Sequence, residues 1–225
     1  MKLKVGIFDS GIGGFTILNS LLKTRNDVEV FYLADIKRVP YGKKDFEQIR
    51  SIAKEICNWF KDKNLDVLLI ACNTTNSCAL DILENNLKIP VFDLINSVSE
   101  KITKKYIGVL ATPLTIKSSY YKKTIESKGE NIKVFQQACP EFVSEIEKNN
   151  LNFKKLNFLS RLYLNPLLKE NIEEIILGCS HYPLIYDVLK NQINSNINII
   201  DPSLALVNKF NNSFAIPKNR CYEYI

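Results

Sequence analysis

Short apolar runs alternate with longer segments of helical period along the whole chain. The runs predict strands at 4–8, 28–34, 66–71, 89–94, 106–111, 131–137, 174–178 and 197–200. Residues 44–60 carry an apolar stripe at helical spacing, which we expect to lie in the core: Phe46, Ile49, Ile52, Ala53, Ile56, Trp59 and Phe60. Apolar strands separated by helices are typical of parallel sheets covered by helices, so the pattern predicts an α/β fold.

The two halves of the chain resemble each other. "KVGIFDSG" near the start is similar to "KYIGVLATP" at 105–113, and "VLLIACNTT" at 67–75 is similar to "EIILGCSHY" at 174–182. We therefore expect two related lobes, each a mainly parallel sheet flanked by helices, formed by residues 1–94 with 201–225 and by residues 95–200. The carboxyl ends of such strands face the ligand crevice, which predicts that Asp9, Cys72, Thr112 and Cys179 line a cleft between the lobes.

Composition narrows the class of protein. The net charge is +6, but the lysines are scattered without a basic block beside aromatic residues, so we expect no nucleic-acid partner. The six cysteines include no CxxC pair, and a single histidine makes a zinc site improbable. We expect reduced thiols in a cytoplasmic protein, because the start lacks a signal-peptide pattern and no apolar run could cross a bilayer.

The segment "GIFDSGIGGFTIL" at 6–18 predicts a strand that ends at Asp9 and Ser10, followed by a glycine turn that opens a helix. It matches a dinucleotide fingerprint only in part, because Thr16 stands where a third glycine is needed, and it lacks the Gly-Lys-Ser/Thr of a phosphate-binding loop. Its backbone N–H groups suit a carboxylate as well as a phosphate. The alternative is a tight turn in which Asp9 only caps the helix.

Two cysteines, Cys72 and Cys179, lie at matched strand ends. A thiol must be partly ionised to act as a base, so a titratable neighbour is expected: His181 for Cys179 and Asp9 for Cys72. Opposed thiols could remove a proton from one face of a carbon acid and return one to the other face. Cys–His acyl transfer is an alternative that leaves one cysteine unexplained, and simple packing is the alternative for either cysteine taken singly.

Five motifs extend this interpretation: "GIFDSGIGG" at 6–14, "RVPYG" at 38–42, "ACNTT" at 71–75, "ACPEFVSEIE" at 138–147 and "LGCSHYPL" at 177–184. In this order, and over nearly the whole chain, they resemble the cofactor-independent glutamate racemases of the aspartate/glutamate racemase superfamily. The resemblance implies interconversion of L- and D-glutamate without pyridoxal phosphate or a metal, which in bacteria supplies D-glutamate for peptidoglycan and the cell wall.

The resemblance also implies roles for individual residues. Cys72 and Cys179 would be the two catalytic acid/bases, with Asp9 assisting Cys72, and His181 and Glu147 assisting Cys179. Glutamate would be held by Ser10, Pro40, Tyr41, Gly42, Asn73, Thr74, Thr112, Thr115 and Ser180. Small hydroxyl and amide groups of this kind can satisfy an amino acid without fixed counter-ions.

Some positions depart from the family pattern. Ile36 follows Asp35 where the family usually has threonine, Thr75 and Asn76 replace Ala-Ser, and Ser180 replaces threonine. The crossover "DLINSVSE" at 93–100 lacks the usual glycine and proline. Family chains also tend to continue beyond the position of Ile225, so we expect the first lobe to be incomplete or closed by a partner, as in a homodimer.

Three alternatives to glutamate racemisation stay open. The first is an aspartate or other amino-acid racemase with the same chemistry. The second is an amino-acid-binding protein without catalysis. The third is a Cys–His hydrolase or acyl-transferase, which would need Cys179 but not Cys72.

Overall fold

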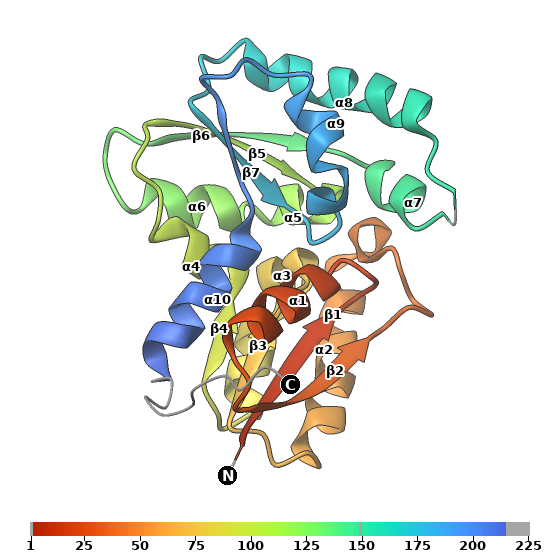
Figure 1. The fold of residues 1–225 in the computed structure, drawn as a ribbon, viewed down its shortest axis with the longest axis vertical. Coiled ribbons are helices and arrows are strands. Elements are labelled where there is room, and N and C mark those ends of the chain that lie inside the picture. Colours follow the sequence, from red (N-terminus) through yellow and green to blue (C-terminus); the bar gives the residue numbers. More distant parts are fainter. Residues whose placement is uncertain (1, 149, 215–225) are drawn as a thin grey trace, which may run out of the picture.

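Two parallel sheets, one above the other, form the centre of the molecule (Figure 1). The computed structural model describes residues 2–148 and 150–214. Within that range the strand orders are β2-β1-β3-β4 and β6-β5-β7-β8, and every pairing is parallel. The predicted two-lobed α/β fold is therefore confirmed.

The eight predicted strands are all present, with ends that differ by at most two residues from the prediction. The first sheet contains β1 (Leu3–Asp9), β2 (Val28–Ala34), β3 (Val67–Ile70) and β4 (Val91–Asp93). The second contains β5 (Tyr106–Ala111), β6 (Lys133–Ala138), β7 (Glu174–Gly178) and β8 (Asn198–Ile200).

Helices cover both faces of both sheets. The helices nearest the first sheet are α1 (Phe15–Thr24), α2 (Phe46–Lys61), α3 (Asn73–Asn86) and α10 (Pro202–Ser213), with the short η1 (Tyr41–Lys43). Those nearest the second are α4 (Leu94–Ser99), α5 (Pro113–Ser118), α6 (Tyr120–Glu126), α7 (Phe142–Ile146), α8 (Phe153–Leu168) and α9 (Tyr186–Lys190), with the short η2 (Tyr182–Ile185). Four apolar clusters fill the spaces between sheets and helices.

The duplication seen in the sequence extends to the register of the sheets. Val5 pairs with Val67, and at the matching place in the second lobe Ile107 pairs with Glu174. Asn64 and Asn171, which precede β3 and β7, share an unusual left-handed backbone with φ of 48° and 50°. The two lobes therefore repeat one architecture down to single backbone angles.

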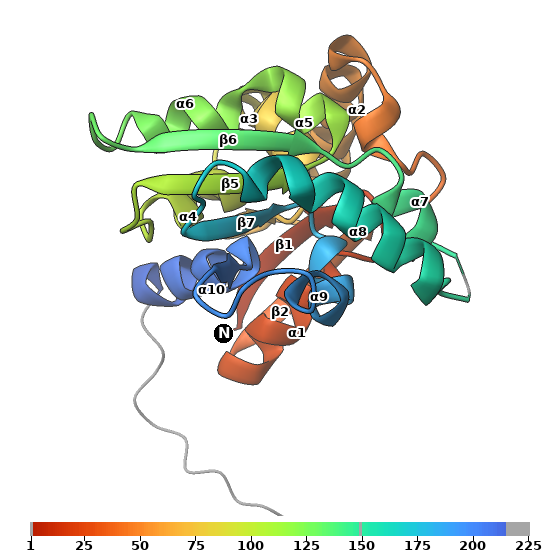
Figure 2. The ribbon, with the colours of Figure 1, turned by 90° about the horizontal axis from the view of Figure 1, so that it is seen from above.

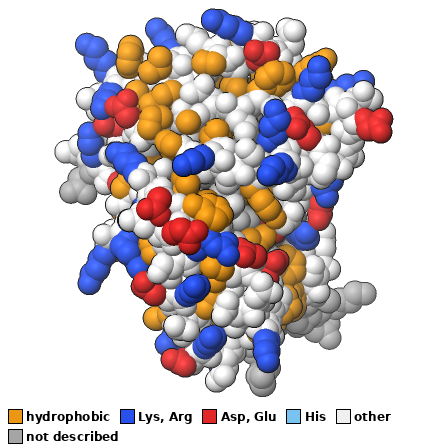
Figure 3. Space-filling model, turned by 180° about the vertical axis from the view of Figure 1, so that it is seen from behind, with side chains coloured by type: hydrophobic (Ala, Val, Ile, Leu, Met, Phe, Trp, Pro, Cys, Tyr) orange, Lys and Arg blue, Asp and Glu red, His pale blue; other side chains and the backbone are white. Residues whose placement is uncertain are grey.

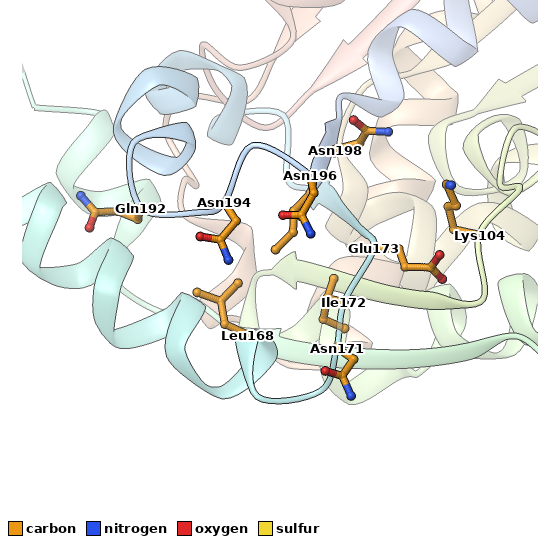
Figure 4. A pocket seen from close by; sticks show the side chains of 10 residues that line it. Lys104, Leu168, Asn171, Ile172, Glu173, Gln192, Asn194, Asn196 and Asn198 are labelled. Carbon is orange, nitrogen blue, oxygen red and sulfur yellow. The ribbon is translucent and has the colours of Figure 1, made fainter.

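Two hollows at the amino ends of the sheets are part of this repeat. Asn64 and Leu65 line the hollow in the first lobe, and Asn171 and Ile172 occupy the equivalent places in the second. Figure 4 shows the second hollow, with amide side chains of residues 171, 192, 194 and 196 at its rim. We attribute both hollows to the fold, because they recur with different side chains at the sheet edge that lies away from the cysteines.

The lobes are joined along one edge of the molecule. The chain passes from β4 into α4 and later from β8 into α10, and these two helices pack against each other. Figures 1 and 2 both place α4 and α10 at the edge opposite α7. The crossover at 93–100 forms α4 itself, whose first turn is capped by the Asp93 side chain accepting from the Asn96 backbone N–H at 2.9 Å.

We propose the division into residues 1–94 with 201–225 and residues 95–200. The apolar side of α10 supports it, because Leu206, Val207 and Phe210 pack with β1 and α1 of the first lobe. Ala205, by contrast, packs with the second lobe. Residues 215–225 of the predicted first lobe lie outside the described residues.

The prediction that all aromatic residues of the α2 stripe lie in the core is wrong for two of them. Phe46 is 42% exposed and Trp59 is 38% exposed, whereas Phe60 is buried. Phe46 lies under the Arg50 guanidinium and Trp59 under the Lys63 ammonium. Because an aromatic face attracts a cation in water-accessible positions, both rings find partners at the surface without entering the core.

Candidate active site

Asp9 is the last residue of β1, and it is fully buried. Its Oδ2 accepts hydrogen bonds from the backbone N–H of Gly11 at 3.2 Å and of Gly14 at 2.8 Å. Ser180, from the second lobe, donates to Oδ1 at 3.0 Å. Burial raises the pKa of Asp9, although the His181 charge and these donors oppose the shift. The backbone N–H groups of the glycine turn, which we expected to bind a carboxylate, thus bind the carboxylate of Asp9 itself. Through Ser180 the same carboxylate also connects the two lobes.

The glycines of the turn allow a close approach between the lobes. A Cβ atom on Gly11 would lie 2.3 Å from Oε1 of Glu147, and one on Gly13 would lie 2.5 Å from Oγ of Ser180. Real side chains do not pack at such distances. The "GIGG" sequence therefore serves contact with the second lobe, and the partial nucleotide-binding match has this structural explanation.

Cys72 follows β3 and precedes α3. The thiol is buried and donates to Oγ of Ser10 at 3.5 Å. Burial, followed by the nearby Asp9 charge, raises the pKa of Cys72 to about 12, against the opposing hydrogen bond of Ser10. Asp9 thus acts on Cys72 through its charge, because the Asp9 carboxylate accepts its hydrogen bonds from Gly11, Gly14 and Ser180. Cys72 is protonated at neutral pH.

Cys179 follows β7 and forms a chain of contacts with His181 and Glu147. Its Sγ lies 3.8 Å from Nδ1 of His181, and Nε2 of the same ring lies 2.5 Å from Oε1 of Glu147. The Ile12 backbone N–H donates to that oxygen at 3.3 Å, so Glu147 also contacts the first lobe. The three side chains form one connected system from the thiol to the inter-lobe boundary.

The charges in this system support one another. Burial alone would lower the pKa of His181, but its hydrogen bonds with Cys179 and Glu147 raise it to about 10. The hydrogen bond from His181 lowers the pKa of Glu147, which outweighs the opposing effect of burial. At neutral pH the pair is therefore an imidazolium and a carboxylate, with the imidazolium beside the Cys179 sulfur.

Both cysteines face one narrow cavity between the lobes. It is lined by Ser10, Tyr41, Gly42, Cys72, Asn73, Thr74, Thr112, Val143, Cys179, Ser180 and His181. Its free space is about 10 Å³, roughly that of one water molecule, whereas the hollow of Figure 4 offers about 460 Å³ by the same measure. The structure therefore describes the lobes closed on the cysteines.

Three buried threonines form one wall of this cavity. The hydroxyl of Thr74 lies 3.0 Å from that of Thr112 and 3.2 Å from that of Thr115, and the last two are 2.9 Å apart. Thr74 comes from the first lobe and the others from the second. Thr115 supports the cluster from behind and does not line the cavity. Since hydroxyl groups can donate or accept, this cluster can adapt to a carboxylate or an ammonium.

The 40–42 segment closes the cavity from the first lobe. Tyr41 and Gly42 line it, whereas Pro40 precedes them without lining it. The Tyr41 hydroxyl donates to Asp35, which also accepts from Arg38 at 2.5 Å. A Cβ atom on Gly42 would lie 2.3 Å from Cβ of Thr112, so this glycine too permits contact between the lobes.

The structure adds residues that the sequence did not single out. Val143 lines the cavity from α7, and its place inside the "ACPEFVSEIE" motif was the available signal. Tyr32 reaches the glycine turn, where its hydroxyl donates to the Gly11 carbonyl at 3.4 Å. Tyr121 donates to Oδ1 of Asn73 at 2.6 Å. Neither tyrosine lies in a motif, so no local pattern marks it.

The described residues contain neither a metal-binding cluster nor a membrane-spanning helix. Within residues 2–148 and 150–214, no group of three or more His, Cys, Asp or Glu side chains could hold a metal ion. Five cysteines in that range are free and buried, and Cys221 lies outside it. No helix in the described part of the chain is both long and apolar enough to span a membrane. On the face seen in Figure 3, basic and acidic side chains are intermixed.

Known proteins resemble this chain over most of its length. The family model described as Asp/Glu/Hydantoin racemase matches residues 16–210. A glutamate racemase from Prochlorococcus marinus (strain NATL1A) is 46% identical over 204 residues, covering 91% of this chain and 77% of that protein.

Solved structures agree with the sequence relatives. Glutamate racemase from Francisella tularensis, solved in complex with D-glutamate, is 34% identical with a TM-score of 0.90, covering 94% of this chain and 80% of that one. Picrophilus torridus aspartate racemase shares the fold with a TM-score of 0.66 at 17% identity, covering 95% and 94%.

Proposed function

Because the chain belongs to the Asp/Glu/Hydantoin racemase family, we propose that it interconverts L- and D-glutamate by proton transfer at Cα between two thiols. It is an amino-acid racemase and therefore an isomerase. The observation that carries the mechanism is the single cavity that Cys72 and Cys179 line from different lobes. Two acid/base groups on opposite sides of one carbon are what inversion requires.

The two thiols have different neighbours. The raised pKa of Cys72 keeps its proton on sulfur, and the imidazolium of His181 lies beside the Cys179 sulfur. In one direction Cys179 removes the α-proton and its S–H bond forms as the C–H electron pair stays on Cα. Cys72 then gives its proton to the opposite face of that carbon. The reverse direction exchanges the two roles.

The remaining groups of the site hold the substrate and tune the thiols. The Asp9 charge disfavours a thiolate at Cys72, so this thiol keeps its proton until a carbanion forms at Cα, and in the reverse direction its thiolate is a stronger base. The hydrogen bonds with Cys179 and Glu147 together raise the pKa of His181. Ser10, Ser180, Asn73, Thr74 and Thr112 present hydroxyl and amide groups to the cavity, which Tyr41 and Gly42 also line. The chemistry needs neither pyridoxal phosphate nor a metal.

Glutamate is the preferred substrate because the relatives that cover most of the chain are named glutamate racemases. An aspartate racemase would use the same thiols. An acyl-transferase would leave the lining position of Cys72 without a purpose, and a binding protein would not need the polarised Cys179–His181–Glu147 system.

The cellular setting follows from the reaction. We place the enzyme in the cytoplasm, where thiols stay reduced, as the source of D-glutamate for peptidoglycan and cell-wall synthesis. Its partner is the small-molecule substrate, without nucleic acid or membrane, and a homodimer is the assembly we propose.

Proton NMR of the purified protein in D2O tests the reaction directly. L-glutamate and D-glutamate are incubated separately, and loss of the α-proton signal is followed together with optical rotation. We expect both enantiomers to lose the signal and to converge on a racemic mixture, with aspartate as the comparison substrate. Folded, reduced protein that exchanges neither enantiomer would rule out glutamate racemisation, and exchange of aspartate alone would reassign the substrate.

A further inference from the structure

Tyr121 connects the second lobe to a substrate-facing residue of the first. The side chain comes from α6 and is fully buried. Its hydroxyl donates to Oδ1 of Asn73 at 2.6 Å, and Asn73 is the first residue of α3 and lines the cavity. The ring is held in place at the end of β7, where a Cβ atom on Gly178 would lie 3.2 Å from it. The tyrosine therefore has little freedom to turn away from Asn73.

This hydrogen bond decides which way the Asn73 amide faces. Oδ1 is occupied by the tyrosine hydroxyl, and no hydrogen bond of Nδ2 is found among the residues that the structure describes. Burial raises the pKa of Tyr121 well above its ordinary value, so the hydroxyl keeps the proton that it donates. The cavity is thus offered an N–H donor rather than a carbonyl acceptor.

The position of this donor indicates what it binds. Asn73 directly follows Cys72, so a substrate whose Cα–H faces the Cys72 thiol places a group attached to Cα next to Asn73. The first backbone N–H groups of α3 have no partner within the helix and also favour negative charge there. A set of donors at this place matches the α-carboxylate and not the ammonium group.

We propose that Tyr121 is a positioning residue for the racemase reaction, which fixes the Asn73 amide as a hydrogen-bond donor to the α-carboxylate of the substrate. This inference rests on the proposed function. When the α-proton leaves, negative charge spreads onto that carboxylate, so the donor stabilises the transition state more than the bound substrate. Because the tyrosine and the asparagine belong to different lobes, the donor is aligned only when the lobes are closed.

The test begins with Tyr121→Phe, which removes one oxygen and keeps the ring. We expect kcat/KM to fall about tenfold for both enantiomers, the scale of one hydrogen bond to a charged group, with most of the loss in kcat. Tyr163→Phe is the matched control. Tyr163 is also buried in the second lobe, but its hydroxyl bonds Glu141, away from the cavity. The control should keep the kinetic constants of the unaltered enzyme.

A double-mutant comparison separates positioning from a general structural role. If Tyr121 acts through Asn73, adding Tyr121→Phe to Asn73→Ala should cause no further loss of kcat/KM. Asn73→Asp preserves the acceptor for Tyr121 but replaces the donor by a second oxygen, so it should lose more activity than Asn73→Ala. This variant also tests the idea if Tyr121→Phe folds poorly, as judged by its circular dichroism and melting temperature.

The outcomes separate this inference from the proposed function. Unaltered protein that exchanges neither enantiomer in D2O would defeat the racemase assignment itself. Active unaltered protein together with a fully active Tyr121→Phe would overturn the role of Tyr121. Losses that add fully in the double variant, or an Asn73→Asp enzyme as active as the unaltered one, would also overturn it.

Discussion

Replacing Glu147 by glutamine removes one of the charges that raise the pKa of His181. The carboxylate oxygen lies 2.5 Å from Nε2, and the side chains of His181 and Glu147 are only 2% and 22% exposed. Hydrogen bonds to charged groups contribute about 1.5–3 kcal/mol, and 1.36 kcal/mol corresponds to one pKa unit. The pKa of His181, about 10 in the unaltered protein, should therefore fall by roughly one to two units in Glu147→Gln.

The single histidine makes this shift directly measurable. In a protein without an affinity tag, the imidazole C2–H signal belongs to His181 alone and can be followed by NMR from pH 5 to 11 without assignment. The same samples give the rate of α-proton exchange in D2O, whose alkaline decline should move down in pH with the histidine. An unaltered protein that titrates near 6.5, or a Glu147→Gln protein with an unchanged pKa, would refute the reasoning.

The free energy of unfolding should depend on pH through the protonation of His181. The folded-state pKa of His181 lies above the ordinary value of 6.5, so its contribution is fully present below pH 6.5 and is lost as the pH rises toward 10. The difference in melting temperature between the unaltered protein and Glu147→Gln should consequently be largest near neutral pH and shrink above pH 10. A difference that grows in alkaline solution would contradict the charge assignment.

Further substitutions test the thiols and the glycine turn. Cys72→Ala and Cys179→Ala should each lower the rate of racemisation at least a hundredfold. Cys57→Ser should stay active, because the Cys57 thiol faces the Ile82 carbonyl within the core of the first lobe. Optical rotation of either enantiomer measures these rates, and an active Cys72→Ala would point instead to acyl transfer. Gly11→Ala should lower kcat/KM more than tenfold, because the added Cβ would overlap the Glu147 carboxylate. The control Gly129→Ala should leave kcat/KM unchanged, because its added Cβ would lie 3.5 Å from the nearest atom. Equal activity of the two variants would show that the glycine turn at Gly11 has room to move.

Much of the fold was predictable because the signals are local. Each strand is a short apolar run, and the repeat of strand ends places the two cysteines at matching positions. The partial exposure of Phe46 and Trp59 was not predictable from helical spacing. The spacing of apolar residues along a helix indicates which side of the helix faces the sheet, but it does not indicate where the sheet beneath the helix ends.

The site was predictable in its reactive groups and less so in their partners. Cys179 and His181 are two residues apart, so their contact follows from the chain itself. Asp9 bonds Ser180 from 171 positions away, and Tyr121 bonds Asn73 from 48 positions away. Such pairs arise only when two separately folded lobes are brought together, and no periodicity in either lobe contains that information.

The side-by-side arrangement of α4 and α10 has a mechanical consequence for turnover. The two chain segments that connect the lobes both run along one edge, so this edge acts as the hinge when the lobes separate. The cavity admits about one water molecule, so glutamate enters and leaves only when the lobes separate at the opposite edge. There the Lys43 ammonium donates a hydrogen bond to the Ser144 hydroxyl at 3.1 Å. Each catalytic cycle then breaks and remakes the inter-lobe contacts of Asp9, Glu147 and Asn73, and the frequency of that motion sets an upper limit on kcat.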